Sequence, residues 1–378
     1  MTDFDDIRPY DDDEIQGIIA DLISDPMFIN ILGQLYPQQE ENKFILQFLS
    51  SLDNVADLQS KIICPLLDKV EKISTNGISY STMDQFHPDD KYLFISNHRD
   101  IILDSALLNL IMHRNGFRKT EIAIGDNLLI YKWIELLVRI NRSFIVKRNL
   151  GLREQLEASK KLSAYIRHAL TIKGESVWLA QREGRAKDGN DQTQPAILKM
   201  LNMSNEGSRL EGFFELNIVP MAISYEIEPC GISKVEELLK RKYNADFAKT
   251  QQDDLQSMVN GFVYPKGRIH YAFGNPLNYK LVELIKGKNM NDSIQAISEY
   301  IDKRIYYNYK LWPTNYLAYD LLNQTQKYSN QYNSLEKDQF ISRMENEVSS
   351  LNFDKAETIE LYLRMYANPV FNFEKHFG

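Results

Sequence analysis

The spacing of apolar residues along the chain changes twice. In residues 1–76 apolar side chains recur every three or four positions, as in EIQGIIADLI and FILQFLSSL, and this period predicts helices. From about residue 77 short apolar runs alternate with helical patterns, and from residue 286 the pattern is helical to the end. We therefore expect an N-terminal helical region (1–76), an α/β region (77–285) and a C-terminal helical extension (286–378).

The middle region carries the pattern of a sheet enclosed by helices. Strands that alternate with helical segments form mostly parallel sheets covered on both faces. The predicted fold class is therefore α/β, with a mostly parallel central sheet flanked by helices and with helical extensions at both ends. The Ser-, Asn- and Asp-rich residues 74–90 predict a loop before the first strand. The predicted strands are residues 92–96, 121–125, 144–146, 176–180, 218–224 and 268–274.

One helical segment and one strand carry features that the structure can test. In residues 152–170, Leu152, Leu156, Ile166 and Leu170 can share one buried face. In residues 218–224, Pro220 removes one donor from the hydrogen-bond ladder, which predicts a bend or a sheet edge at that point.

The longest apolar stretch is LLIYKWIELLVRI, residues 128–140, which three charged residues interrupt. A core helix is the simplest interpretation. The alternatives are the wall of a pocket for an acyl chain, or contact with a bilayer through Trp133 and Leu136. We expect no membrane-spanning helix and, from the acidic first residues, no secretory signal.

Composition and charge narrow the class of partner. The chain has 378 residues, 43% of them apolar, and a net charge of −8, which argues against nucleic acid as a partner. Residues 1–26 hold nine acidic residues and one basic residue, whereas residues 139–187 hold twelve basic and four acidic residues. This local positive charge suggests an anionic ligand or a membrane surface, with a solvated helix face as the alternative. Cys64 and Cys230 match no metal-ligand spacing, so we expect buried thiols in a reducing compartment.

The segment YLFISNHRDIILD holds the first candidate for chemistry. His98 follows a predicted strand, and Asp100 is a suitable N-cap for the helix after it. Asp104 lies one helical turn further, on the same face, and its carboxylate can reach back to the imidazole. A histidine oriented by a carboxylate can act as a general base at neutral pH. No Ser or Cys in the segment is an evident nucleophile, so we expect the base to act on a substrate hydroxyl.

His98 has three interpretations other than a general base. The first is an ordinary histidine in a surface turn. The second is a metal ligand, and no second His or Cys lies at ligand spacing, so no metal is expected. The third is a kinase catalytic loop, suggested by the letters HRD, but Ser105 stands where that loop has Asn, and no Gly-rich loop is present.

Two basic motifs follow later predicted strands. Lys147 and Arg148 come directly after residues 144–146, and the segment QREGRAK, which contains Arg185 and Lys187, follows residues 176–180. The carboxyl ends of parallel strands meet at one edge of a sheet, so we expect His98, Arg148 and Arg185 to lie around one crevice. Guanidinium groups bind phosphate well, and a turn of solvated charges is the alternative.

Within the second motif, Gly184 allows a close turn, and Glu183 either holds Arg185 or binds a substrate hydroxyl.

Taken in order, these segments resemble the glycerolipid acyltransferases, the superfamily of glycerol-3-phosphate and lysophosphatidate acyltransferases. The family's first block, Asn-His-x-Ser-x-x-Asp, is similar to NHRDIILD. A later Phe-Ile-x-Arg block is similar to FIVKR, and Glu-Gly-Thr-Arg-Ser or Glu-Gly-Gly-Arg-Ser is similar to EGRAKDG. A Val-Pro strand and a Phe-Gly-x-Pro strand are similar to IVPMAISYE and IHYAFGNPL. The resemblance covers about residues 90–277.

The resemblance implies a reaction and a set of roles. An acyl group passes from acyl-CoA or acyl-carrier protein to a hydroxyl of glycerol 3-phosphate or its 1-acyl ester, in phospholipid biosynthesis. His98 acts as the base and Asp104 orients it. The phosphate-binding residues implied are Arg148, Arg185, Lys147 and Lys187, and the supporting residues are Asn97, Asp100, Glu183 and Gly184. No metal or organic cofactor is implied.

This sequence departs from the family pattern at two places. Five residues separate His98 from Asp104, where the family has four, so Asp100 is an alternative partner for the imidazole. The residue between Gly184 and Arg185 is missing, which leaves the phosphate contact of Arg185 open.

The expected protein is a cytoplasmic acyltransferase, bound peripherally to the inner face of the cell membrane. Two alternatives stay open: an acyltransferase for another lyso-lipid, such as one derived from an amino acid, and a non-catalytic protein that binds acyl chains or lipids.

Overall fold

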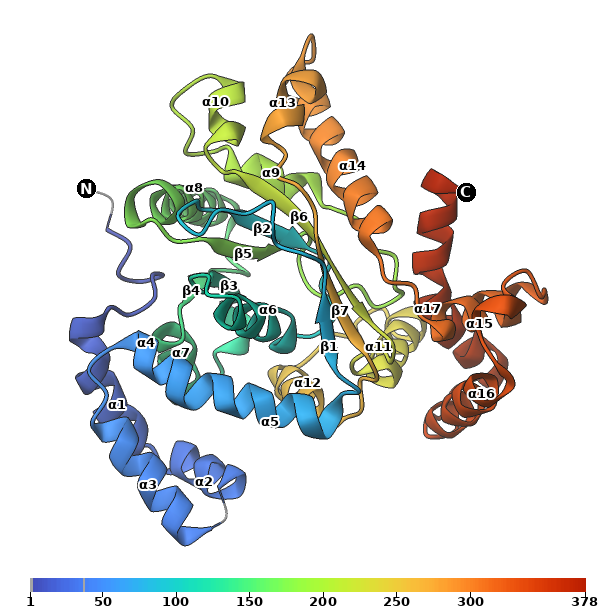
Figure 1. The fold of residues 1–378 in the computed structure, drawn as a ribbon, viewed down its shortest axis with the longest axis horizontal. Helices are drawn as coiled ribbons and strands as arrows, with labels where there is room; N and C mark the ends of the chain where they lie inside the picture. The colour runs from blue at the N-terminus through green and yellow to red at the C-terminus, as the bar shows by residue number, and fades with distance from the viewer. Residues whose placement is uncertain (1–2, 37) are drawn as a thin grey trace.

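A seven-stranded sheet forms the centre of the molecule (Figure 1). The computed structural model describes residues 3–36 and 38–378. The strands are β1 (Ile78–Tyr80), β2 (Leu93–Ser96), β3 (Glu121–Gly125), β4 (Ser143–Val146), β5 (Val177–Ala180), β6 (Ile218–Tyr225) and β7 (Ile269–Phe273). Their order is β1-β7-β6-β2-β5-β3-β4, and each neighbouring pair is parallel except β6 and β7. The predicted fold class, a mostly parallel sheet flanked by helices, is confirmed.

Helices occupy both ends of the chain and every connection except that between β1 and β2. The N-terminal helices are α1 (Ile15–Ser24), α2 (Pro26–Leu35), α3 (Gln39–Ser50), α4 (Val55–Leu58) and α5 (Cys64–Ser74). Those within the sheet region are α6 (Leu103–Arg114), α7 (Lys132–Ile140), α8 (Leu152–His168), α9 (Pro195–Leu201), α10 (Arg209–Phe214), α11 (Gly231–Tyr243), α12 (Gln251–Val263) and α13 (Asn278–Ile285). The last are α14 (Met290–Asn308), α15 (Pro313–Asn323), α16 (Ser334–Ser349) and α17 (Lys355–Phe377). Short 3-10 turns cover Asp12–Glu14, Asp126–Leu128 and Ser329–Gln331, and π-helical turns cover Gln59–Ile63 and Ala169–Lys173.

All six predicted strands are present, and their ends differ by one residue at most. The expected loop at 74–90 contains a strand that the sequence did not reveal, because β1 has only three residues and its side chains are mostly exposed. The sequence also gave no indication of α9–α12, which fill the connections between β5, β6 and β7.

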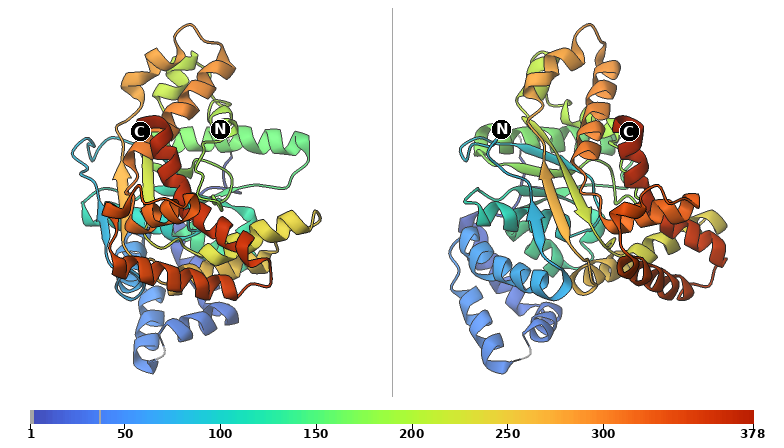
Figure 2. Two further views of the ribbon diagram at one scale, coloured as in Figure 1. Left: turned by 90° about the vertical axis from the view of Figure 1, so that its right-hand side faces the viewer. Right: turned by 45° about the vertical axis from the view of Figure 1, so that its right-hand side comes forward.

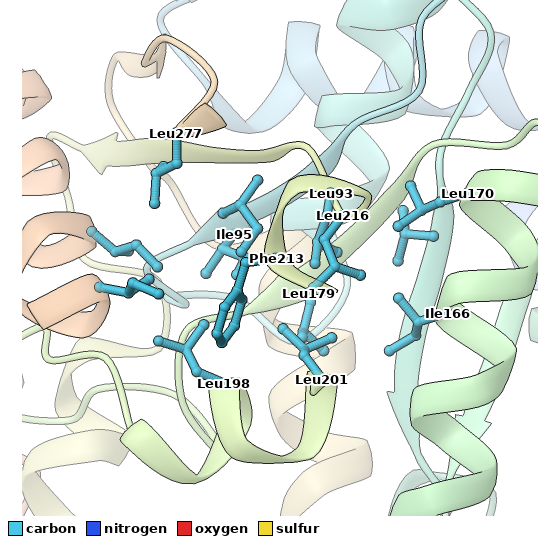
Figure 3. Close-up of a cluster of buried hydrophobic side chains, with 14 of the residues drawn as sticks. Leu93, Ile95, Ile166, Leu170, Leu179, Leu198, Leu201, Phe213, Leu216 and Leu277 are labelled. Atoms are coloured by element: carbon cyan, nitrogen blue, oxygen red, sulfur yellow. The ribbon is translucent and has the colours of Figure 1, made fainter. Parts of the chain in front are cut away.

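Alternate residues of the central strands pack on opposite faces of the sheet, as its pleat requires. On one face Leu93, Ile95 and Leu179 contact side chains of α8, α9, α10 and α14 (Figure 3). On the other face Phe94 and Trp178 contact α5 and α6. Helices therefore cover both faces, and the functional candidates are confined to the edge where the strands end.

Helix α7 is a core helix. Trp133 and Leu136 are 8% and 4% exposed and pack against the N-terminal helices. A bilayer contact through these two side chains, one of the alternatives weighed from the sequence, is therefore wrong. The apolar face of α7, which suggested the bilayer contact, is covered by α1–α3.

Helix α8 buries only the second half of its predicted apolar face. Ile166 and Leu170 lie in the core, whereas Leu152 is 96% exposed and Leu156 is 46% exposed. The first turns of this helix project beyond the body of the molecule (Figure 2, left). The four-residue buried face was thus wrong in its first half, because the sheet ends before the helix does.

Pro220 lies in a central strand, not at an edge, because β6 pairs with β2 on one side and β7 on the other. The β6–β7 ladder begins only at Met221, and the carbonyl of Pro220 accepts a hydrogen bond from the N–H of Gly274. The missing donor therefore falls where the ladder with β7 has not yet begun.

An acidic N-terminal strap, residues 3–11, lies along the basic part of the chain. The Asp6 carboxylate pairs with both Lys147 and Lys161, and these cations lower its pKa despite its partial burial. The carbonyl of Ile7 accepts a hydrogen bond from the N–H of Ile145 in β4, the outermost strand. Part of the positive charge noted in the sequence is thus neutralised within the molecule.

The structure also describes possible membrane spans, the two cysteines and possible metal ligands. Within residues 3–36 and 38–378 no single helix is long and apolar enough to cross a membrane. The segments Asp12–Ser24 and Pro26–Gln34 meet at a bend of 81°. Only as a pair are they long and apolar enough for a span, judged by length and composition alone. Cys64 and Cys230 are both buried and free. No group of three potential metal-binding His, Cys, Asp or Glu side chains occurs in the described parts of the chain.

Candidate active site

Five parallel strands end at the same edge of the sheet and bring three sequence motifs together there. β2 leads into Asn97–Asp100, β5 into residues 181–187, and β4 into Lys147 and Arg148. β2 and β5 are direct neighbours, while β3 lies between β5 and β4. The shared edge follows from the parallel topology alone.

His98 and Asp104 form a close pair at this edge. Nδ1 of His98 lies 2.8 Å from Oδ2 of Asp104, whose side chain is fully buried. An ionised carboxylate only accepts hydrogen bonds, so this contact places the proton on Nδ1 and leaves the Nε2 lone pair free. The His98 side chain keeps 13% of its surface exposed and stands edge-on to the Trp178 ring. The arrangement can take a proton from a group that approaches Nε2.

Asp104, and not Asp100, contacts the imidazole. Oδ1 of Asp100 accepts hydrogen bonds from the N–H groups of Ile102 and Leu103, at 3.0 and 2.8 Å, at the start of α6. Burial and the nearby Asp104 carboxylate raise the pKa of Asp100. Asp100 therefore holds the beginning of the helix that carries Asp104.

The turn before His98 is fixed by Asn97. Its side chain donates to the carbonyl of Ile223 at 2.9 Å and accepts from the N–H of the same residue at 2.8 Å, which ties the end of β2 to β6. It also contacts Asp191 at 3.3 Å. Asn97 is buried, so its role is to position the turn.

The loop after β5 connects the two sides of the edge. The N–H of Ala186 donates to the carbonyl of His98 at 3.2 Å. Gly184 has φ +70°, a left-handed conformation that suits glycine. Arg185 is 8% exposed, and its buried Nη1 has no hydrogen-bond partner among the described residues. An unpaired buried guanidinium nitrogen beside the His98 loop is a candidate contact for an anionic ligand.

Arg148 reaches this loop from β4. A side chain on Gly125, at the end of β3, would place its Cβ 2.8 Å from Nε of Arg148, so the guanidinium lies across that glycine. Nη1 of Arg148 is 3.5 Å from Oε1 of Glu183. Arg148 thus reaches from the end of β4 across the end of β3 to the loop after β5. Glu183 therefore meets Arg148, while Ala186 of the same loop meets His98.

Comparison with known proteins agrees with this geometry. A family model described as Acyltransferase matches residues 77–224, which include β2–β5 and all three motifs. Residues 77–224 are an acyltransferase domain. The resemblance to the glycerolipid acyltransferases is thereby confirmed.

One solved structure and the curated proteins complete the comparison. The 1-acyl-sn-glycerophosphate (LPA) acyltransferase PlsC from Thermotoga maritima is similar over 77% of this chain and 91% of its own, with 8% identity and a TM-score of 0.39. No curated protein matches the chain.

Two predicted phosphate-binding residues of the acyltransferase domain are paired with carboxylates. Lys147 pairs with Asp6 of the strap, and Nζ of Lys187 lies 2.9 Å from Oε1 of Glu237 in α11. Burial lowers the pKa of Lys187, although Glu237 partly compensates. Arg148 also contacts a carboxylate, that of Glu183, but at the longer distance of 3.5 Å, and among the described residues Arg185 forms no ion pair.

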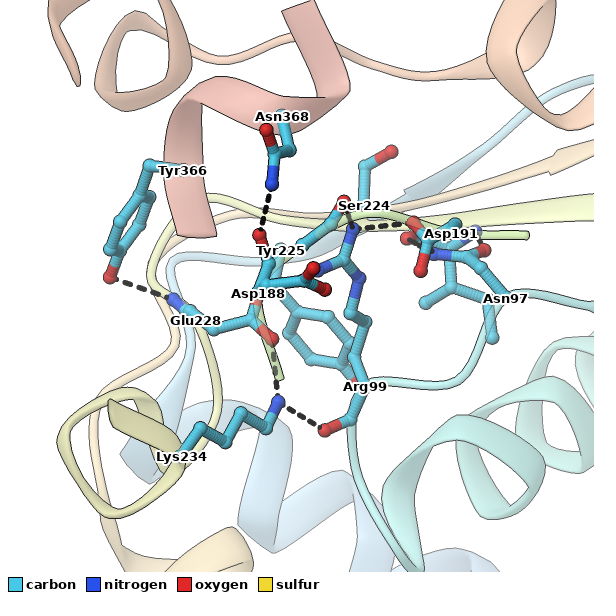
Figure 4. A network of polar contacts seen from close by, with 12 residues as sticks. Asn97, Arg99, Asp188, Asp191, Ser224, Tyr225, Glu228, Lys234, Tyr366 and Asn368 are labelled. Carbon is cyan, nitrogen blue, oxygen red and sulfur yellow. Dashed lines mark hydrogen bonds and ion pairs between the residues drawn. The ribbon is translucent and has the colours of Figure 1, made fainter. Parts of the chain in front are cut away.

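A buried polar network behind the His98 loop escaped the sequence analysis (Figure 4). The Arg99 guanidinium lies 2.5 Å from the Asp191 carboxylate and 3.5 Å from that of Glu228, and Nζ of Lys234 donates to the Arg99 carbonyl. Burial would lower the pKa of Arg99, but the two carboxylates hold it above its usual range. Tyr309, after α14, donates to Asp191 at 2.6 Å.

These residues come from β2, the loop after β5, β6, α11 and the C-terminal region, so no single segment of sequence could reveal them. The network encloses a cavity of about 20 Å³ beside Arg99 and Tyr225, which has room for about one water molecule. A larger groove of about 340 Å³ lies between α15 and α17, away from the acyltransferase motifs. The network therefore supports the acyltransferase domain from behind.

Proposed function

We propose that the protein is an O-acyltransferase that transfers a fatty acyl group from an acyl thioester to a hydroxyl of glycerol 3-phosphate or 1-acyl-glycerol 3-phosphate. The observation that carries the proposal is the 2.8 Å contact of His98 with buried Asp104, at the sheet edge that also presents Arg148 and Arg185. The acyltransferase family of this segment limits the chemistry to acyl transfer.

The reaction balances with one general base. Nε2 of His98 takes the proton of the acceptor hydroxyl while the hydroxyl oxygen attacks the thioester carbonyl. The tetrahedral intermediate then expels the thiolate, which takes the proton from Nε2 and leaves as the free thiol. Asp104 keeps the imidazole in the tautomer that this step needs. No step requires a metal or an organic cofactor.

The acceptor phosphate binds at Arg148 and Arg185 in this proposal. Both side chains belong to the loops around the His98 turn, and the free Nη1 of Arg185 offers an unused donor. Lys147 and Lys187 are assigned a longer-range role, because each already forms a close ion pair with a carboxylate, whereas the contact of Arg148 with Glu183 is 3.5 Å long. The donor is an acyl thioester of coenzyme A or of acyl-carrier protein.

A peripheral place on the inner face of the cell membrane, in the cytoplasm, is part of the same proposal. Its support is the exposed start of α8, where Leu150, Leu152 and Leu156 are 37%, 96% and 46% exposed next to the side chain of Arg153. Apolar side chains beside a cation suit the interface of an anionic bilayer. We expect Leu152→Ser with Leu156→Ser to weaken co-sedimentation with anionic vesicles, whereas Ile172→Ser, an exposed control beyond the other end of α8, leaves it unchanged.

The central experiment is an activity screen of the purified protein. Acyl-CoA and acyl-carrier-protein donors are combined with glycerol 3-phosphate, 1-acyl-glycerol 3-phosphate and other lyso-lipids, and products are detected by mass spectrometry. We expect an acylated phosphate ester that depends on the acceptor and is lost in His98→Ala. A product only with another lyso-lipid would reassign the acceptor. Thioester binding without any product would favour a non-catalytic acyl-binding protein.

A second measurement addresses the phosphate site. Arg185→Ala should raise KM for the phosphorylated acceptor by at least about tenfold with little change in KM for the donor, because a charge-assisted contact is lost. Arg364→Ala, at an exposed position of α17, is the matched control and should leave both constants unchanged. An unaltered acceptor KM in Arg185→Ala would remove this residue from the site.

A further inference from the structure

The Asp104 carboxylate has an unusual set of donors. Oδ2 accepts from Nδ1 of His98 at 2.8 Å and from the N–H groups of Arg99 at 2.6 Å and Asp100 at 3.0 Å. All three of these donors belong to the turn before α6. Oδ1 accepts from the hydroxyl of Tyr225 at 2.9 Å. Within residues 3–36 and 38–378 this hydroxyl is the one hydrogen-bond donor to Oδ1 and the one donor from outside the His98 turn.

Tyr225 keeps its proton and donates a hydrogen bond to this carboxylate. It is the last residue of β6, it is 5% exposed, and it belongs to the group of side chains in Figure 4. Burial raises the pKa of Tyr225 well above its usual range, and the nearby Asp104 raises it further. A phenol that stays neutral has one proton to donate, and its geometry directs that proton to Oδ1.

We propose that Tyr225 is a positioning residue of the His98–Asp104 pair, whose hydroxyl fixes the rotation and the charge distribution of the Asp104 carboxylate and so sets the direction and basicity of the imidazole. The kinetic part of this inference rests on the proposed function. Its geometric part rests on the four hydrogen bonds to Asp104 alone.

The need for such a residue follows from burial. Asp104 is fully buried, and among the described residues Oδ1 has no donor besides Tyr225. An unpaired buried carboxylate oxygen is strongly disfavoured, and the carboxylate would turn toward the donors of the His98 turn. With Tyr225 in place, Oδ1 is satisfied and Oδ2 stays directed at Nδ1.

Other charged and titratable groups lie around the pair but act elsewhere. The Arg99 side chain faces Asp191 and Glu228, and the Asp100 carboxylate caps the start of α6. The Tyr271 hydroxyl, from β7, donates to the backbone carbonyl of Asp104 at 2.9 Å and not to its carboxylate. The Tyr271 hydroxyl also lies beside that of Tyr225. Tyr271 therefore offers a comparison with the same residue type, also buried, on the next strand, whose hydroxyl contacts the backbone and not the carboxylate of the same aspartate.

The test compares Tyr225→Phe with Tyr271→Phe in the full chain. Tyr225→Phe should lower kcat by about 10- to 100-fold and leave KM for both substrates within about twofold, because it disturbs the base and not the binding groups. A carboxylate that has lost one donor attracts the imidazolium proton more strongly, so the acidic limb of the kcat/KM profile should move to higher pH. Tyr271→Phe should keep kcat within about threefold and leave the profile in place.

Coupling provides a second signature. In the Asp104→Asn background, Tyr225→Phe should cause little further loss of kcat, since the group through which it acts is gone. Additive losses in the double variant would contradict the proposal. Equal effects of the two phenylalanine variants on kcat and on the pH profile would reduce Tyr225 to a packing residue.

A readout without catalysis separates this inference from the proposed function. The NMR titration of the His98 ring, assigned with His98→Gln, should move to higher pH in Tyr225→Phe and stay unchanged in Tyr271→Phe. If the protein has no acyltransferase activity but this shift occurs, the proposed function fails and the positioning role stands. Activity in the parent without the shift overturns the positioning role alone.

A non-disruptive substitution covers the case in which Tyr225→Phe does not fold. Introduction of 3-fluorotyrosine at position 225 keeps the shape and makes the hydroxyl a stronger donor. The His98 titration should then move to lower pH, opposite to the effect of Phe. No movement, or movement in the same direction as for Phe, contradicts the proposal.

Discussion

At His98, five residues separate the imidazole from the carboxylate that it contacts, and groups of the turn before α6 and of β6 hold that carboxylate. Asp104 sits in the first turn of α6, where two backbone N–H groups and the Tyr225 hydroxyl fix it. Asp100 takes the place of the family's serine and holds the helix start through Oδ1. The pair forms with the longer spacing because these contacts, and not the spacing alone, direct Asp104 toward Nδ1.

This division of labour predicts different outcomes at the two aspartates. Asp104→Asn should lower kcat by about 10²- to 10⁴-fold, since a neutral amide stabilises the imidazolium poorly and permits the wrong tautomer. Asp100→Asn should keep kcat within about tenfold, because Asn also accepts at a helix start and the raised pKa of Asp100 shows that its charge is disfavoured there. Steady-state kinetics with thermal unfolding as a folding control measures both. A larger loss of kcat at Asp100 would reassign the partner of His98.

A half-buried carboxyl in α14, that of Asp302, gives a prediction about pH. Burial raises the pKa of Asp302 to about 6, and its Oδ1 accepts the Thr193 N–H at 2.7 Å. The folded state thus binds a proton that the unfolded state releases near pH 4, so this group lowers stability as the pH rises from 4 to 6. Asp302→Asn keeps the acceptor without the charge. It should raise the free energy of unfolding at pH 7 by up to about 3 kcal/mol.

The pH dependence of the gain is the control. In urea unfolding, the advantage of Asp302→Asn should shrink below pH 6 and vanish near pH 4, where both states of the parent carry the proton. A gain that is constant from pH 4 to 8 would show that the charge is not its cause.

The limits of sequence reasoning at this scale follow from where each residue lies. His98, Asp104, Arg148 and Arg185 follow strand ends within short motifs, so the sequence could name them. Tyr225 lies 121 residues after Asp104, at the end of a fully buried strand where a tyrosine is indistinguishable from a core residue. The partners of Arg99 are equally distant, and only the folded chain brings them together.

At the scale of elements, both apolar side chains and ion pairs hold the N-terminal strap against the rest of the molecule. Asp6 pairs with two lysines at the surface, while Ile7 is 3% exposed in the core and Phe4 stands edge-on to Tyr165. Exposed ion pairs contribute about 0–1 kcal/mol, whereas burial of an isoleucine side chain contributes several times more. The strap is therefore held mainly by its apolar side chains.

Two single substitutions in the strap test this balance. Ile7→Ala should lower the free energy of unfolding by about 2–4 kcal/mol, and Asp6→Asn by less than about 1 kcal/mol. Denaturant unfolding at low and high salt measures both, and only the Asp6 effect should diminish with salt. The reverse order of losses would show that charge, and not burial, fixes the strap.

The elements that sequence analysis missed have a common physical cause. Strong periodicity revealed the six longer strands and the helices α6, α7 and α8, but not α9–α12. β1 has too few residues to show a period, and α8 extends beyond the surface that its apolar stripe would need. Periodicity predicts which face is apolar, but the length of the neighbouring sheet decides how much of that face is buried.

At the scale of the whole molecule, the C-terminal helices support the sheet edge that carries His98. The hydroxyl of Tyr366, from α17, accepts the Glu228 N–H at 3.0 Å, and Glu228 in turn faces Arg99 and Lys234. The same helices cover Leu239 of α11, which is fully buried. The C-terminal helices thus contain a polar link to the loop next to His98.

Removal of α15–α17 tests this dependence. A chain that ends at residue 312 should lose its cooperative thermal transition or melt at least about 10 °C lower, because it uncovers an apolar core and leaves buried charges without partners. Leu335→Ala, at an exposed position of α16, should leave the transition unchanged. A truncated chain with an unaltered transition would show that the C-terminal helices fold and act independently.

The strap has a further consequence for how copies of the chain behave at high concentration. An outermost strand with free N–H and C=O groups is a template on which another molecule can add its own strand. In β4 the Ile145 N–H is already bonded to Ile7, so the strap covers part of this edge. A preparation trimmed of its first eleven residues would expose that template, so aggregation on storage should begin with proteolysis at this end.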